Sequence, residues 1–508
     1  MSLKFKSGLN TLMNPVSIRY FHGCSISYAK KLHWAKEAVK KSHVDRALEH
    51  YDDFYASVFK NRWPSFRLGL LSSPKYVAVP NVFTNSVDQI SESLEDLGAY
   101  NLASIWTAQS SQIERDLEEM KLQQDMEGVS KLDQTLEKIA LTKQAEEMDT
   151  LYHNAPRQKM HIESYVTEDT AGSRVLKDIR EASQEHVTET RLKGADDFLL
   201  ESEYYTFYAN QLNPRNHAGQ TEFPYTKISN FTKLKFPPLL RPYAFEAGNT
   251  NTFPGAARHT FSGLREFICI NGASLAPIIA LDLKPDITLL DLCSGPGTKS
   301  LLSYMTTCPL LMTCNDVESG RLYRVKNMFK EFIGPDLPNN IELVRFNATN
   351  YPGTFKYTRV LADVPCLSDR ISCTMPDNNI FKPTRIKERL GLVNVQKDIL
   401  LSALNALAPE EGSSCVYSTC TLSPIENDGA VSAALRETPI DGLEVDLLGL
   451  WTALKPLQQA GFFHISRTKF GVLIEPNIVS NFGPMYVCRI VYQPPKNSNT
   501  DAVLSELE

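Results

Sequence analysis

The sequence predicts an α/β fold, in which a mostly parallel central sheet is flanked by helices and follows a helical N-terminal extension. Three observations lead to this prediction. Five short apolar runs, each typical of a buried strand, follow one another between residues 288 and 417. A tight glycine turn at residues 295–297 follows the first run, and a pattern that predicts a helix begins at Thr298. Polar or thiol groups stand at the end of each run, where open α/β sheets bind their ligands.

The ends of these five predicted strands indicate a ligand site. A glycine turn between a strand and a helix also occurs for packing alone, so the turn by itself leaves the question open. An acidic residue at the end of the second strand, about 20 residues further on, suits the two hydroxyl groups of a ribose. The strands and the groups that follow them are 288–290 with Asp291, 310–314 with Asp316, 341–346 with Asn347, 359–362 with Asp363 and Cys366, and 414–417 with Cys420.

The composition sets limits on function. The chain has 508 residues, 42% hydrophobic and 22% charged, which is typical of a soluble globular protein of several domain-sized units or of one large domain with insertions. Its formal net charge of -6 excludes a globally basic nucleic-acid binder, so any contact with RNA depends on local patches. No apolar run approaches the roughly 20 residues that span a membrane. The cysteines are scattered without Cys-x-x-Cys pairs, which favours reduced intracellular thiols and predicts no metal site.

Four motifs occur in order along the chain: DLCSGPGTK at 291–299, Asn315-Asp316 followed by Arg321, DVPC at 363–366, and YSTC at 417–420. Together they resemble the motifs of the Sun-domain (Nop/Sun) RNA cytosine-5 methyltransferases. Further stretches at 271–274, 379–382 and 481–486 resemble the mitochondrial small-subunit ribosomal-RNA branch of that family. The resemblance is strong from about Pro237 to Tyr492, moderate from Trp34 to Phe83, and absent between them.

This resemblance implies a Rossmann-like, S-adenosylmethionine-dependent methyltransferase that forms 5-methylcytosine in mitochondrial small-subunit ribosomal RNA and supports mitoribosome assembly. It also implies a location in the mitochondrial matrix and a helical-repeat partner of the mitochondrial termination-factor type. Such a partner would bring the RNA-binding surface that this acidic chain lacks. The alternatives are a ribosome-assembly factor that keeps the fold without catalysis, and a tRNA or DNA cytosine-5 methyltransferase.

The chemistry of cytosine methylation explains why two cysteines at predicted strand ends are candidate catalytic residues. Carbon 5 of the ring is a poor nucleophile until a thiolate adds to carbon 6 and creates an enamine. The step needs a cysteine with a lowered pKa and an acid at ring nitrogen 3. The residues alone leave open which cysteine attacks. DNA cytosine methyltransferases use a cysteine that follows a proline as the nucleophile, and in this chain that cysteine would be Cys366. The resemblance implies that Cys420 attacks, Cys366 releases the adduct and Asp363 activates the base.

The strand ends also offer partners for each part of S-adenosylmethionine. Asp316 is placed for the ribose, and the backbone from Cys293 to Gly297 for the methionine end. Lys299 and Arg321 are placed to offset the cofactor carboxylate or a nearby phosphate. Where the family usually has an aspartate for the adenine amino group, this chain has Asn347, whose uncharged oxygen still accepts a hydrogen bond; we expect modestly weaker binding or a shift of this role. The predicted cofactor site is Cys293, Ser294, Gly295, Pro296, Gly297, Lys299, Asp316, Arg321, Asn347 and Asp363.

A basic run follows the strand that leads to Cys366. The target base must be flipped or already single-stranded, so the enzyme needs contacts with the RNA backbone beside the site. A charge run is often only a solvated face, but its position at the rim of the site favours contact with phosphates. The predicted RNA-binding residues are Lys382, Arg385, Lys387 and Arg389.

The chain divides into five predicted segments. The first carries Lys4, Lys6 and Arg19 with no acidic residue before Glu37, which is typical of a mitochondrial transit peptide, a disordered cytosolic tail being the alternative. The third is rich in Glu, Gln, Lys, Ser and Thr. The segments are 1–27 (transit peptide), 28–85 (N-terminal helical extension), 86–200 (a polar insertion, helical or disordered), 201–495 (the methyltransferase domain with its approach segment) and 496–508 (a disordered acidic tail).

Overall fold

The structure is a computed structural model, and it describes residues 41–116, 227–228, 234–354, 356–437 and 444–493. The chain divides into two units, Met1–Lys41 and Ser42–Glu508, and every element below belongs to the second. The predicted transit peptide at 1–27 and acidic tail at 496–508 lie outside the described residues, as does most of the predicted insertion.

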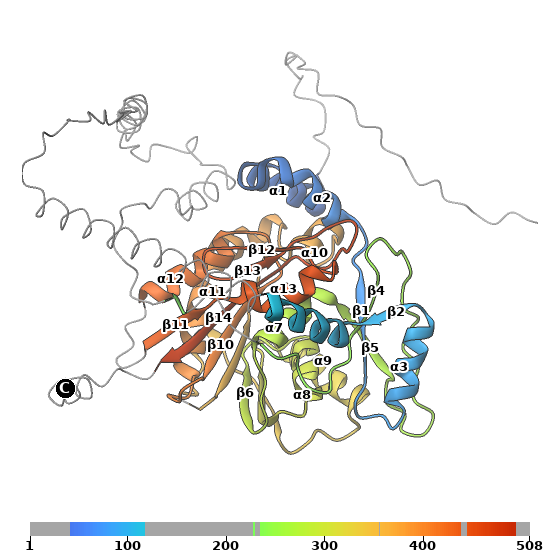
Figure 1. Cartoon of the computed structure of the whole chain (residues 1–508). Helices are drawn as coiled ribbons and strands as arrows, with labels where there is room; N and C mark the ends of the chain where they lie inside the picture. Colours follow the sequence, from blue (N-terminus) through green and yellow to red (C-terminus); the bar gives the residue numbers. More distant parts are fainter. Residues whose placement is uncertain (1–40, 117–226, 229–233, 355, 438–443, 494–508) are drawn as a thin grey trace, which may run out of the picture. The chain divides into compact units, whose positions relative to one another are not determined.

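A mixed sheet of ten strands within the described residues forms the core of the second unit (Figure 1). The strands are β3 (Lys227–Ile228), β6 (Ile287–Asp291), β7 (Pro309–Asn315), β8 (Ile341–Val344), β9 (Arg359–Asp363), β10 (Ser414–Thr419), β11 (Glu444–Leu448), β12 (Ile465–Arg467), β13 (Val472–Ile474) and β14 (Met485–Gln493). Strands β6 to β10 are paired in parallel, whereas β12, β13 and β14 pair antiparallel, and β14 borders β10. The predicted mostly parallel sheet is confirmed.

The order of the parallel strands fixes where a ligand binds. The path of neighbouring strands is β12-β13-β14-β10-β9-β6-β7-β8. The chain therefore runs outward from β6 through β7 to β8, and then returns to the other side of β6 to form β9 and β10. This reversal puts the topological switch point between β6 and β9, and open α/β sheets bind ligands in the crevice outside the strand ends at such a point.

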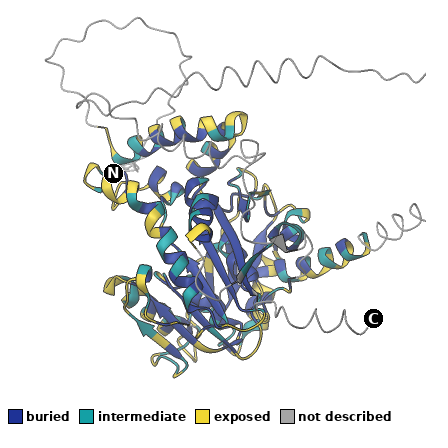
Figure 2. Ribbon diagram, turned by 90° about the vertical axis from the view of Figure 1, so that its left-hand side faces the viewer, coloured by how far each residue is buried: buried dark blue, intermediate teal, exposed yellow. Residues whose placement is uncertain are grey.

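Helices cover both faces of the sheet, and each face has its own apolar core. Because successive residues of a strand point to opposite sides, Leu289 belongs to one core cluster and Leu290 to the other. Figure 2 shows the strands between them almost entirely buried. The cluster with Leu289 includes residues of α7 (Leu275–Ala280), α8 (Thr298–Met305), α9 (Ser319–Phe332) and α13 (Leu450–Gln459). The cluster with Leu290 includes residues of α1 (His43–Phe59), α2 (Trp63–Leu71), α10 (Asp369–Thr374), α11 (Ile386–Ala406) and α12 (Ala430–Glu437).

The N-terminal helices α1 and α2 form part of this second core. Helix α1 begins with a capping box, in which Ser42 and Asp45 satisfy each other's backbone N–H groups. Its buried face packs against α10, and a short turn, η1 (Lys60–Arg62), connects it to α2. The side chain of Trp63 is only 4% exposed, so this tryptophan is part of the core.

A second sheet includes chain beyond residue 85, within the segment predicted to be a helical or disordered insertion. It has the order β2-β4-β1-β5, is antiparallel, and joins β1 to strands more than 160 residues downstream by sequence number. The ordered chain continues through a helix at 102–116, where Leu102 and Trp106 enter the main core. Local composition cannot reveal such long-range pairing. The elements are β1 (Tyr76–Pro80), α3 (Val87–Asp96), β2 (Ala99–Asn101), β4 (Tyr243–Phe245) and β5 (Phe267–Asn271).

Within the described ranges, no helix is long and apolar enough to cross a membrane. Nor do the side chains of these ranges bring three or more His, Cys, Asp or Glu residues together in a way that could hold a metal ion.

Candidate active site

The turn after β6 is built for close approach of another group. The Gly295 N–H donates to Oδ2 of Asp316 over 3.2 Å. A Cβ atom at Gly295 would lie 2.6 Å from that oxygen and 2.7 Å from Cβ of Arg321, so no other residue fits without movement. Gly297 has φ 109, a left-handed conformation that favours glycine, and α8 begins directly after it. The two glycines therefore let the turn pack closely against Asp316, Arg321 and Val325.

Asp316 is held at the end of β7 by backbone donors. Its side chain is almost fully buried, and Oδ1 accepts a hydrogen bond of 2.9 Å from the Glu318 N–H. The preceding residue, Asn315, ties three strand ends together, because its amide donates to Leu292 O and to Phe346 O. Sequence reasoning missed this role of Asn315. A polar residue that is buried at a strand end is the signal that could have indicated it.

Arg321 and Asn347 are placed less directly than predicted. Arg321 forms an exposed ion pair with Glu318, with Nε 3.0 Å from Oε2. Asn347 is exposed and caps a short helical turn, η4 (Ala348–Asn350), where its Oδ1 accepts from the Thr349 N–H over 3.2 Å. Its oxygen is thus already engaged, and an aspartate would offer a second oxygen as well as a charge.

Lys299 lies in the catalytic cluster rather than apart from it. Its Nζ is 2.6 Å from Oδ2 of Asp363, and the Ser418 hydroxyl donates to Oδ1 of the same carboxylate over 2.7 Å. Burial opposes the charged form of Lys299, but the charge and hydrogen bond of Asp363, together with Cys420 and Asp291, raise the pKa of the ammonium group. The structure therefore pairs two members of the predicted cofactor site, one of which, Asp363, was also predicted to be catalytic.

The two predicted catalytic cysteines are in contact. Sγ of Cys366 and Sγ of Cys420 are 3.2 Å apart, both are free thiols, and the Cys420 N–H donates to Sγ of Cys366 over 3.3 Å. The Ser368 hydroxyl lies 3.3 Å from the Cys420 sulfur. This contact arises because β9 and β10 are parallel neighbours whose carboxyl ends meet at the same edge.

The environment favours ionisation of Cys420 over Cys366. The hydrogen bond from Cys366 lowers the pKa of Cys420 despite burial, and Ser368 and the charge of Lys299 act in the same direction. The same hydrogen bond, together with burial, raises the pKa of Cys366 well above its usual value. Cys420 is therefore the better candidate for the thiolate.

A buried acid lies beneath this pair. Glu426 belongs to η6 (Ile425–Gly429), and its Oε2 accepts from the Leu367 N–H over 3.0 Å and from Nε2 of Gln396 over 2.9 Å. Gln396 also donates to Pro365 O, so it bridges the two segments. Burial raises the pKa of Glu426 to about 8, which makes it mainly a neutral acid at neutral pH. The sequence gave no indication of this residue.

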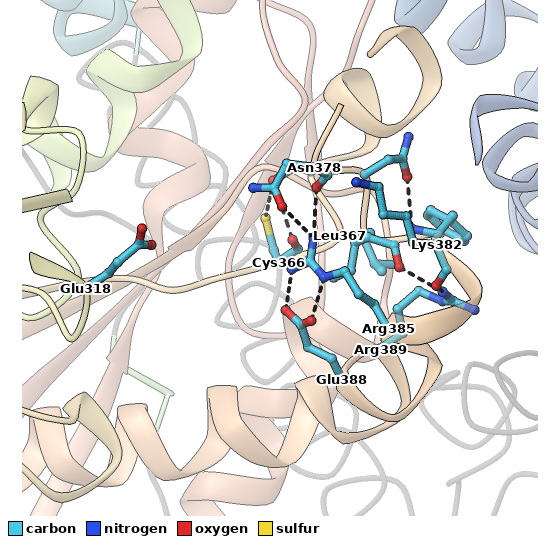
Figure 3. A network of polar contacts seen from close by, with 12 residues as sticks. Glu318, Cys366, Leu367, Asn378, Lys382, Arg385, Glu388 and Arg389 are labelled. Atoms are coloured by element: carbon cyan, nitrogen blue, oxygen red, sulfur yellow. Dashed lines mark hydrogen bonds and ion pairs between the residues drawn. The ribbon is translucent and has the colours of Figure 1, made fainter. Parts of the chain in front are cut away.

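The basic run is only partly exposed. Arg389 is 6% exposed, donates to Ile380 O over 2.8 Å and lies 4.8 Å from the centre of the Phe381 ring, so it is structural. Figure 3 shows Arg385 facing Glu388, with Nε 2.6 Å from Oε2. Lys387 and Arg389 are two positions apart in α11, so their side chains leave the helix on different sides. Lys387 is exposed and Lys382 half-buried.

Two thiols in contact at the carboxyl ends of neighbouring parallel strands, near the buried carboxylate of Asp316, match the arrangement expected of a cytosine-5 methyltransferase. Comparisons with known proteins show the family. A family described as 16S rRNA methyltransferase RsmB/F matches residues 278–448. The chain belongs to the RsmB/F (NOL1/NOP2/Sun) family of RNA cytosine-5 methyltransferases.

Three relatives illustrate the family's range. The 5-cytosine rRNA methyltransferase nsun-4 of Caenorhabditis elegans is 29% identical over 90% of this chain and 93% of its own length. The 5-cytosine rRNA methyltransferase NSUN4 of Mus musculus is 33% identical over 53% of this chain and 70% of its own length. A mitochondrial tRNA (cytosine(34)-C(5))-methyltransferase of Danio rerio is 34% identical over 56% of this chain and 72% of its own length.

The enzyme depends on S-adenosylmethionine, which supplies an electrophilic methyl group when bound. The residues of this chain fit that cofactor. The space above Gly295 accepts no side chain, and the buried Asp316 carboxylate is positioned by two backbone donors at the end of the second parallel strand. We propose that Asp316 holds the ribose and that the 293–297 backbone faces the methionine end.

We expect Asn347→Asp to tighten cofactor binding by roughly three- to tenfold, because a charged acceptor forms a stronger hydrogen bond with an adenine amino group. The cap of η4 is kept, since aspartate caps equally well. Isothermal titration with S-adenosylhomocysteine measures the change, and Asn350→Asp controls for added charge nearby. Equal affinities for wild type and Asn347→Asp would show that Asn347 does not contact the adenine.

The stability of the chain should report the proton on Glu426. The folded chain keeps this proton up to a pH of about 8, whereas an unfolded glutamate loses it near 4.5. The unfolded state then binds fewer protons, so this residue makes the wild type less stable as the pH rises from about 4.5 to about 8. Glu426→Gln lacks the effect and should gain stability relative to wild type across that window.

Chemical denaturation at several pH values measures this difference, with the exposed Glu410→Gln as the matched control. Two stability curves that stay parallel for wild type and Glu426→Gln would contradict a buried, protonated Glu426.

Proposed function

We propose that this enzyme methylates carbon 5 of a cytosine in mitochondrial small-subunit ribosomal RNA, and that it supports mitoribosome assembly. The nematode rRNA methyltransferase supports the substrate class, because the similarity extends over 90% of this chain, whereas that to the zebrafish tRNA enzyme extends over 56%. The transit-peptide composition of residues 1–27 supports the location in the mitochondrial matrix.

The contact between the two thiols is the observation that supports catalysis most directly. In the proposed reaction the Cys420 thiolate adds to carbon 6 of the cytosine, and the electron pair of the 5,6 double bond moves to carbon 5 and the ring. Ring nitrogen 3 faces Asp363, and the proton shared between Lys299 and Asp363 over 2.6 Å offsets the charge that develops there. Carbon 5 then takes the methyl group.

Release of the product requires a base. The methylated carbon 5 still bears its original proton, and we assign its removal to Cys366, which lies beside the adduct. As that proton leaves, the electron pair restores the 5,6 double bond and expels the Cys420 thiolate. The raised pKa of Cys366 keeps this thiol protonated until release, when its own proton passes to the leaving Cys420 sulfur 3.2 Å away and Cys366 takes the proton from carbon 5.

A basic partner is part of the proposal. The chain has a formal net charge of -6, and the structure leaves Lys382 and Lys387 as the more accessible members of the basic run. We propose that Lys382, Arg385 and Lys387 touch RNA phosphates and that a helical-repeat protein of the mitochondrial termination-factor type supplies the remaining RNA-binding surface.

Trapping of covalent RNA tests the assignment of the cysteines. With S-adenosylmethionine present, Cys366→Ala should accumulate a denaturant-resistant RNA adduct, because the chain attacks but cannot release. Cys420→Ala should form none, and Cys269→Ala, at an exposed cysteine outside the site, should behave like wild type. An adduct in Cys420→Ala would instead assign the attack to Cys366.

Methylation of purified RNAs tests the substrate. We expect transfer to mitochondrial small-subunit rRNA at least tenfold faster than to mitochondrial tRNAs, since a few correctly placed contacts discriminate by that factor or more. Incorporation of labelled methyl groups measures both rates. Faster transfer to tRNA would overturn the substrate class. Normal ribosome assembly with Cys420→Ala in cells would show that assembly needs the protein and not its catalysis.

A further inference from the structure

A tyrosine of the N-terminal helix reaches the loops that bear the two cysteines. Tyr55 lies in α1, far upstream of the residues 278–448 that match the family. Its hydroxyl donates to Oδ2 of Asp369 over 2.9 Å and lies 3.2 Å from Oγ1 of Thr421. Thr421 directly follows Cys420. The N-terminal extension thus contacts the immediate neighbour of the proposed nucleophile.

The tyrosine ring is held rigidly, so the position of its hydroxyl is fixed. Tyr55 is fully buried, and its ring stacks on Tyr51 with centroids 5.0 Å apart and planes inclined by 2°. Trp63 of α2 packs edge-on against the same ring at 5.2 Å. Burial raises the pKa of Tyr55 well above its usual value, so the hydroxyl remains a neutral donor.

Asp369 connects the segment that follows Cys366 with the segment that follows Cys420. The first residue of α10, it follows Cys366 by three positions, and its carboxylate also accepts from the Thr421 hydroxyl and the Leu422 N–H, each over 2.7 Å. Between Cys366 and Asp369 stands Ser368, at φ 51, whose hydroxyl lies next to both sulfurs. Any rotation of the Asp369 carboxylate therefore moves the donors around Cys420.

The carboxylate needs its donors because it is completely buried. Burial raises the pKa of Asp369 to about 6, and the bonds from Leu422, Thr421 and Tyr55 oppose that shift. Removing one donor from a buried, charged acceptor leaves a desolvated oxygen that the surroundings must rearrange to satisfy. The adjustable part here is the loop at Thr421, since the ring of Tyr55 is clamped by its aromatic neighbours.

We propose that Tyr55 is a positioning residue for methyl transfer: through Asp369 and Thr421 it fixes the loop that carries Cys420, so that the N-terminal helix completes the active site. This inference rests on the proposed role of Cys420 as nucleophile. It predicts that Tyr55→Phe, which keeps the ring and removes one hydroxyl, lowers kcat about tenfold or more with little change in KM for RNA.

The ionisation of Cys420 gives a second readout that needs no RNA. The titratable groups with the largest effects on Cys420 are Cys366, Asp363 and Lys299, Glu426 also interacts with it, and Tyr55→Phe alters none of these groups chemically. Displacement of Ser368 removes a donor from the sulfur. The midpoint of iodoacetamide alkylation of Cys420, followed by mass spectrometry, should therefore move to higher pH.

Tyr486→Phe is the matched control. Its hydroxyl donates to another buried aspartate, Asp428, over 2.7 Å, so the substitution removes the same kind of bond elsewhere. We expect this variant to lose stability but to keep kcat and the alkylation midpoint. Thr421→Val and Thr421→Ser form a second pair on the other side of Asp369, and only the serine should retain activity.

The experiment uses the full chain with mitochondrial small-subunit rRNA. An unchanged kcat and alkylation midpoint in Tyr55→Phe would overturn the positioning role, as would equal losses in Tyr55→Phe and Tyr486→Phe. If Tyr55→Phe fails to fold, equal activity of Thr421→Val and Thr421→Ser overturns it. Methyl transfer by Cys420→Ala would instead refute the proposed nucleophile, which is a separate result.

Discussion

The parallel pairing of β9 with β10 is the constraint on which the active site depends. The register sets Asp363 opposite Ser418, and the Val364 N–H continues the ladder to Ser418 O over 3.1 Å. Beyond this point the two strands leave the sheet side by side, so the segments with Cys366 and Cys420 emerge at one edge. A slip of one residue would turn Asp363 away from Ser418 and Lys299 and would separate the sulfurs.

Burial strengthens the electrostatic interactions at this edge of the sheet, and it also requires that every buried acid have hydrogen-bond partners. In a region shielded from water, one ammonium group at Lys299 acts strongly on both the Asp363 carboxylate and the Cys420 thiol. The same shielding raises the pKa of Glu426 and Asp369, so these acids are tolerated only with dense hydrogen bonding. The resulting network connects the thiols to α1, which is how a helix outside the sheet becomes relevant to catalysis.

The formal net charge of -6 and the burial of Arg389 limit how firmly this chain can hold RNA by itself. Arg389 looks like its basic neighbours in the sequence, yet its guanidinium packs on Phe381 and satisfies backbone oxygens. Desolvating an arginine in this way stabilises the loop after the Cys366 strand but removes a cation from the surface. The division fits an enzyme whose own chain provides the chemistry, while a basic partner, as proposed, provides much of the grip on RNA.

Sequence alone predicted the parallel sheet, the glycine turn and the placement of Asp316 and the two cysteines at strand ends, because strand and turn signals are local and parallel strands deliver their ends to one edge. It did not determine that Lys299 pairs with Asp363, that Arg389 is buried, or that β2 pairs with β4. Tertiary structure decided these, since each depends on contacts between distant segments. The bond from Tyr55 to Asp369 spans 314 positions, and no pattern within either segment specifies its partner.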